Sequence, residues 1–230
     1  MANWQQLCAG PILALLATSV PAAAQPLPSA ASQDAIWQAH EDRLVRIARR
    51  LLGANAPWCT DPAAGNPANP PCPTAFVLRR SGQAAMADKG RVEVAAVLLS
   101  EAPTDDDAAM MVAHEIAHVL LDHRRRIDAA GRNWLTIRRS EREADRLAPW
   151  LMVNAGYDPA AAPRFMAVWG PRHGGGLTRA PTHDGWRDRQ AAMAAEVAEI
   201  ARRRAVQPDG LLDWRARFPS QGPFQRPQDD

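Results

Sequence analysis

The feature that most constrains this chain is the segment His114-Glu115-Ile116-Ala117-His118, which fits the pattern HExxH inside a predicted helix. Thr104 can cap that helix, and the three aspartates after it favour the positive helix end, so we expect it to run to about Arg125. Histidines four residues apart differ by only about 40° around a helix, so both imidazoles project from one face and can bind one ion. Glu115 lies beside the first histidine and can reach a water molecule at the metal.

Two histidines do not complete a catalytic zinc site, which usually takes three protein ligands and keeps a fourth position for water. A third histidine in the metzincin spacing is excluded, because Leu121 and Arg124 stand where that pattern needs glycine and histidine. A following predicted helix offers Glu141, with Asp145 on the same face to orient a histidine. Glu143 is the rival ligand, but it points about 200° away from Glu141 around the helix.

The sequence from about Phe76 to Arg189 resembles the zinc metallopeptidases that include the CAAX prenyl proteases and bacterial periplasmic quality-control proteases, family forty-eight in the peptidase classification. That family's ExxxD motif looks like Glu141 through Asp145, and the resemblance implies that Glu141 is the third zinc ligand. The family's segment before an edge strand is similar to residues 83–90. The expected fold class is α+β, a mostly helical zincin-type domain with a small sheet beside the HExxH helix.

A second segment, Thr182-His183-Asp184 through Arg189, resembles the family's Thr-His-Pro motif with an arginine six residues after the histidine. Asp184 stands in place of the family's proline. In the family this histidine and arginine lie near the active site, which implies that His183 contacts the substrate, the oxyanion or the metal. From the residues alone, a single histidine after a glycine-rich loop is more often a surface residue. Both interpretations stay open at this point.

Together these residues predict peptide-bond hydrolysis with one zinc ion per chain. Glu115 would take a proton from a zinc-activated water and return it to the leaving amine, with His183 and Arg189 as candidate helpers at the oxyanion. The expected partner is an extended or unfolded polypeptide, paired with the strand around Val92 to Ala96. The alternative is a chaperone-like binding module with a structural zinc site, for which His183 is the plausible fourth ligand.

Residues 1–24 have the pattern of a secretory signal, because they lack charged side chains and an apolar run leads to Ala22-Ala23-Ala24. Export to the bacterial periplasm or outer envelope is the expectation. An uncleaved anchor is the competing interpretation, although the run is shorter than the about 20 residues that span a bilayer. In an oxidising compartment Cys59 and Cys72 should form a disulfide across a proline-rich loop.

The remaining patterns divide the chain after the signal into one domain and a tail. The expected boundaries are a metallopeptidase domain over 25–206, comprising an N-terminal helix and proline-rich loop (25–75) and a catalytic core (76–206), and an irregular proline-rich tail over 207–230. With 27 basic and 25 acidic residues, the formal charge of +2 is too balanced to indicate a nucleic-acid partner. Membrane association is not required by the sequence, and the oligomeric state stays open.

Three local expectations complete the prediction. Strands are expected around Phe76 to Arg79 and Arg91 to Leu99, and the helix that carries Glu141 should begin near Ser140. His123 follows His118 by five residues and lies about 140° off the metal-facing stripe, so we expect it to interact with the negative helix end.

Overall fold

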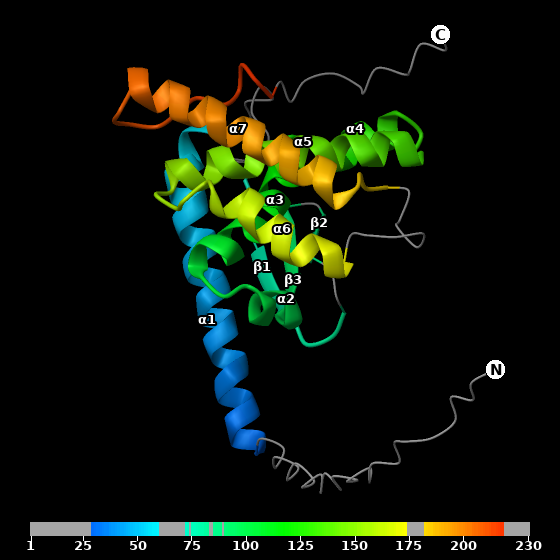
Figure 1. Ribbon diagram of the computed structural model, residues 1–230. Helices are drawn as coiled ribbons and strands as arrows, with labels where there is room; N and C mark the ends of the chain where they lie inside the picture. The colour runs from blue at the N-terminus through cyan, green and yellow to red at the C-terminus, as the bar shows by residue number, and fades with distance from the viewer. Residues whose placement is uncertain are drawn as a thin grey trace, which may run out of the picture.

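The computed structural model describes residues 29–59, 72–73, 75–82, 85–88, 90–173 and 182–218 (Figure 1). The elements are α1 (Ala30–Asn55), the 3-10 helix η1 (Ala56–Trp58), β1 (Ala75–Arg79), β2 (Ala85–Asp88), β3 (Arg91–Ala95), α2 (Ala96–Glu101), α3 (Asp105–Leu120), α4 (His123–Ala129), α5 (Trp134–Asn154), α6 (Ala161–His173) and α7 (Trp186–Val206). This mostly helical fold with one small sheet confirms the predicted α+β class. The expected signal, residues 1–24, lies outside the described residues.

Helix α3 forms the centre of the fold. It packs against α1, α5 and α6, while α7 covers α5 and α6 (Figure 1). Nearly all its side chains from Ala108 to Leu120 are buried, as expected of a helix that is apolar on most of its circumference. Its N-terminus is closed by a capping box, in which Thr104 accepts from the Asp107 backbone N–H and the Asp107 carboxylate accepts from the Thr104 backbone N–H. Because helices pack around it, α3 holds the side chains that it carries in fixed positions.

The sheet has the strand order β1-β3-β2. β1 runs parallel to β3, and β2 runs antiparallel to it, so β3 is hydrogen-bonded on both sides. The prediction that a substrate strand pairs with Val92 to Ala96 is therefore wrong, because β3 has no free edge. The predicted strand Arg91 to Leu99 also ends early, since α2 begins at Ala96. β2 is an edge strand and contacts α3.

Two helix boundaries differ from the prediction. α3 ends at Leu120 rather than near Arg125, because Asp122 adopts the left-handed conformation with a φ of 49° and turns the chain into α4. α5 begins at Trp134, before the expected start near Ser140. Asn133 caps it, since its side chain accepts hydrogen bonds from two backbone N–H groups of the first turn.

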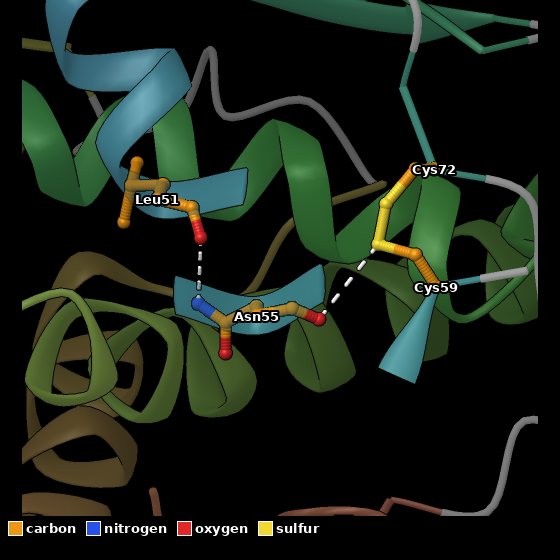
Figure 2. The surroundings of a disulfide bond; sticks show 4 residues. All are labelled: Leu51, Asn55, Cys59 and Cys72. Carbon is orange, nitrogen blue, oxygen red and sulfur yellow. Dashed lines mark hydrogen bonds between the residues drawn. A yellow bond between two sulfur atoms is a disulfide. The ribbon is translucent and has the colours of Figure 1, made fainter. Parts of the chain in front are cut away.

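A disulfide between Cys59 and Cys72 confirms the predicted pairing. Figure 2 shows it beside the end of α1, where the Asn55 carbonyl lies 3.8 Å from Cys59 Sγ. The buried Asn55 amide donates to the carbonyls of Leu51 (2.8 Å) and Leu151 (3.1 Å). The cross-link is thus attached to the core where α1 meets α5.

The described part of the tail, residues 207–218, contains no helix or strand. Its apolar side chains nevertheless enter the core: Leu212, Trp214 and Phe218 are buried, and Trp214 packs edge-on against Trp58 with ring centroids 5.8 Å apart. Among the residues that the structure describes, none of the helices is both long enough and apolar enough to cross a bilayer.

Replacing Glu196 with alanine should lower the free energy of unfolding by roughly 3 kcal/mol, because it removes a buried carboxylate that pairs with two arginines and leaves the buried Trp150 indole N–H without its acceptor. Glu196 is 1% exposed and accepts from Arg146 (2.7 Å), Trp150 (3.0 Å) and Arg217 (3.0 Å), which joins α5, α7 and the tail. Urea unfolding measures the loss. The control Glu199→Ala, whose Arg202 and Arg203 partners are more exposed, should have a much smaller effect; equal losses would contradict this account.

Candidate metal centre

The residues predicted as ligands meet where α3 packs against α5. His114 Nε2 lies 3.3 Å from Glu141 Oε2, His118 Nε2 lies 3.4 Å from Glu141 Oε1, and the two histidine Nε2 atoms are 3.2 Å apart. One ligand atom from each residue falls within 4.8 Å of the others, so the three residues can hold a metal ion. Two imidazoles and one carboxylate are a donor set of catalytic zinc sites, and the residues present therefore fit zinc.

The charges at this point favour a cation. Burial alone would raise the pKa of Glu141, but His118 and His114 outweigh it and hold that pKa well below its usual range. Burial lowers the pKa of His118 and keeps its imidazole neutral, the form that binds a metal. Burial also acts to lower the pKa of His114, but Asp145 and Glu141 reverse this and raise it to about 10. The two carboxylates therefore stabilise positive charge beside His114.

Glu115 lies on α3 beside these ligands and lines the same cavity. Its side chain is buried, and burial raises its pKa to about 7. A carboxyl group with a pKa near neutrality can both accept and release a proton under ordinary conditions, which is the property required of a general base that later acts as an acid. This protonation behaviour follows from its position inside the core.

Asp145 contacts the ring nitrogen of His114 that faces away from the other two ligands. Its Oδ1 lies 3.0 Å from His114 Nδ1, and its carboxylate accepts two hydrogen bonds from Arg189 of α7, at 2.7 and 2.8 Å. Asp145 is 1% exposed, so this pair fixes the carboxylate in a buried position. The structure thus places the guanidinium of Arg189 on Asp145, from where it also lines the cavity. Such a partner orients a histidine ligand and sets its tautomer.

His183 also reaches the site, from the segment just before α7. Its Nε2 lies 3.0 Å from Glu141 Oε2, and its Nδ1 lies 3.0 Å from Thr182 Oγ1. The next residue, Asp184, accepts a hydrogen bond of 2.9 Å from Arg142 of α5. Asp184, which stands where the family that this motif resembles has a proline, therefore holds the segment against the helix that carries Glu141.

His123 lies beside the site, and the expectation that it interacts with the helix end is wrong. It is 1% exposed, and its Nδ1 lies 2.9 Å from Nδ1 of His118. The left-handed turn at Asp122 explains the error, because it ends α3 and redirects the following residues. Glu143, the rival ligand, contacts His123 (3.1 Å) and Arg126 (2.6 Å) instead of the triad. An aspartate, which tolerates the left-handed conformation, was the only local signal for this turn.

The site opens into a cavity of about 1010 Å³. One side is lined by β2, from Ala85 to Asp88. The apolar side chains that line the cavity include Leu98, Met110, Met111, Phe165, Met166 and Trp169. A cavity of this size, with apolar walls and a few convergent polar groups, suits a ligand larger than a single side chain.

Residues 78–166 match the family model described as the IrrE N-terminal-like domain, Peptidase_M78, which represents a zinc metallopeptidase-like family. The matched range contains the three candidate ligands, Glu115 and Asp145, and it ends before Thr182. A comparison with curated proteins finds no match to the chain. The match indicates a zinc metallopeptidase-like domain over these residues, and the matching family model is not that of the family that the sequence motifs resemble.

Proposed function

We propose that this protein is a zinc-dependent metalloendopeptidase in which Glu115 is the general base. The observation that carries the proposal is the convergence of His114, His118 and Glu141 within 4.8 Å, on the wall of a cavity that also contains a buried glutamate. The match to a metallopeptidase-like family model over residues 78–166 supports it independently.

Zinc bound by the triad would supply Lewis-acid chemistry, lowering the pKa of a water molecule and polarising a substrate carbonyl. Glu115 takes the proton from the attacking water and delivers it to the leaving nitrogen, so the peptide bond is replaced by a carboxylate and an amine. Asp145, which forms an ion pair with Arg189, holds the His114 ring in place. Glu115 and His114 are buried on α3, Asp145 is buried on α5, and Arg189 is partly buried on α7, which limits their movement during the reaction.

The substrate that we propose is an extended polypeptide bound beside β2. Among the residues that the structure describes, β2 pairs with β3 alone, and Ala85 to Asp88 line the cavity beside His114, His118 and Glu141. A strand with one free edge can form backbone hydrogen bonds to an added peptide strand, which gives affinity with little dependence on sequence. β2 thus takes the role that the sequence pattern assigned to β3, that of the strand that pairs with the substrate.

Replacing His183 with alanine should lower turnover by about 10²-fold, because the imidazole beside Glu141 would no longer donate to the oxyanion. Zinc content should stay unchanged, since the three ligands remain. Initial rates on a fluorogenic peptide and metal analysis of the same sample measure both. The matched control is His173→Ala, another cavity histidine, which contacts Glu101 instead. A rise in activity would indicate that His183 caps the zinc, and unchanged activity would assign it no catalytic part.

Export and the closer family assignment are also proposals. The Cys59–Cys72 disulfide suits an oxidising compartment, which supports the periplasmic or outer-envelope location proposed from residues 1–24. The resemblance to family forty-eight has its support in Glu141 through Asp145 and in the position of His183 at the site.

The rival function is a chaperone-like module that binds unfolded polypeptides and keeps zinc for structure. A reaction with a permanently unfolded protein in ¹⁸O-labelled water separates the two functions. A peptidase incorporates the heavy oxygen into each new carboxyl terminus, which mass spectrometry detects. Bound but intact polypeptide, without labelled termini, would favour the binding module.

A further inference from the structure

His118 and His123 form a pair at the junction between α3 and α4. Their Nδ1 atoms are 2.9 Å apart, and their rings meet edge to face with centroids separated by 4.8 Å. The other ring nitrogen of His123, Nε2, lies 3.1 Å from Glu143 Oε2 on α5. Arg126, which is largely buried, contacts the same carboxylate with Nη1 at 2.6 Å and Nη2 at 3.3 Å. Two rings and an ion pair therefore form one continuous chain of polar contacts that ends on His118.

The position of the metal ligands decides which way the hydrogen bonds run. His118 Nε2 faces Glu141 and His114 Nε2, so it is the nitrogen on the metal side. A nitrogen that binds a metal has no proton, so a neutral His118 has its proton on Nδ1 and donates it. His123 must then accept at Nδ1 and have its own proton on Nε2, from which it donates to Glu143.

We propose that His123 is a positioning residue, which together with Glu143 and Arg126 fixes the tautomer and orientation of the zinc ligand His118. The inference rests on the proposed zinc site. The two histidine ligands are then held in different ways. Asp145 contacts His114 directly, whereas Glu143 acts on His118 through the imidazole of His123. Asp122 makes this possible, because its left-handed conformation starts α4 with His123 beside His118.

Two substitutions of His123 separate positioning from simple packing. His123→Phe keeps a ring in the buried space but accepts no hydrogen bond. The dissociation constant for zinc should therefore rise by about 10- to 100-fold. His123→Asn retains an acceptor near the position of Nδ1 and should recover most of the affinity, although it fills the space less well. Competition with a chromogenic chelator measures the dissociation constants, and His40→Phe on α1 is the matched control, expected to match the wild type.

The outcomes distinguish this inference from the proposed function. Wild-type protein that binds no zinc would overturn both. If His123→Phe binds zinc as tightly as the wild type does, only the positioning role is overturned. The same holds if His123→Asn binds zinc no more tightly than His123→Phe.

A second measurement needs no variant, so it does not depend on their folding. In cobalt(II)-loaded wild-type protein, the ring N–H protons of metal-bound histidines give NMR signals outside the normal range. Two slowly exchanging signals are expected, one from His114 held by Asp145 and one from His118 held by His123. A spectrum that lacks the protected His118 signal would contradict the hydrogen bond from His118 to His123.

Discussion

Replacing Glu115 with glutamine should lower the rate of peptide hydrolysis by about 10²- to 10⁴-fold while zinc remains bound. The amide has nearly the shape of the carboxylate but cannot accept the proton of the attacking water. The three ligand residues are untouched, so metal content should match that of the wild type. The kcat/KM for a fluorogenic peptide and the zinc content, both measured on the same preparation, check this result.

A matched control for this experiment is Glu93→Gln on β3, whose carboxylate pairs with Arg79 and Arg91 rather than lining the cavity. It should hydrolyse the peptide at the wild-type rate. Undiminished activity in Glu115→Gln would contradict the role of general base, whereas loss of zinc from that variant would indicate that Glu115 contributes to metal binding.

Replacing Glu141 with alanine should weaken zinc binding by more than about 100-fold, since it removes one of three ligands and not merely a supporting contact. Activity should be lost at ordinary zinc concentrations for the same reason. Isothermal titration of the metal-stripped variant with zinc measures the change, with Glu41→Ala, an exposed residue of α1, as the control. Wild-type affinity in Glu141→Ala would remove this residue from the ligand set.

These two variants lie on different helices and lose activity for different reasons. In Glu115→Gln the metal stays and proton transfer fails, whereas in Glu141→Ala the metal itself is lost. Excess zinc should therefore restore part of the activity of Glu141→Ala and none of that of Glu115→Gln.

The candidate ligands could be predicted from the sequence because helical spacing is local. His114 and His118 share a face of any α-helix, so their convergence does not depend on the rest of the fold. Glu141 required the additional fact that a second helix packs against the first, which the family resemblance implied and the α3·α5 packing shows. The disulfide was predictable for a similar reason, since Cys59 and Cys72 flank one loop.

Features that depend on contacts between distant segments could not be predicted in the same way. The order of the strands is set by pairing and packing, which place β3 in the centre of the sheet and make β2 the edge strand that lines the cavity. The contact between His123 and His118 depends on the backbone conformation of one residue, Asp122. Burial of Trp214 in the core likewise depends on the space left beside Trp58, which no local pattern in an irregular tail encodes.

The most direct test of the central claim is hydrolysis of an unfolded protein by the purified chain before chelation, after removal of metal, and after addition of one equivalent of zinc. The account predicts cleavage by the zinc-loaded chain, none by the metal-free chain, and recovery on adding zinc to wild-type protein but not to Glu115→Gln. This last comparison excludes a contaminating protease. Hydrolysis that persists without metal, or that Glu115→Gln carries out as fast as the wild type, would contradict a zinc peptidase centred on His114, His118 and Glu141.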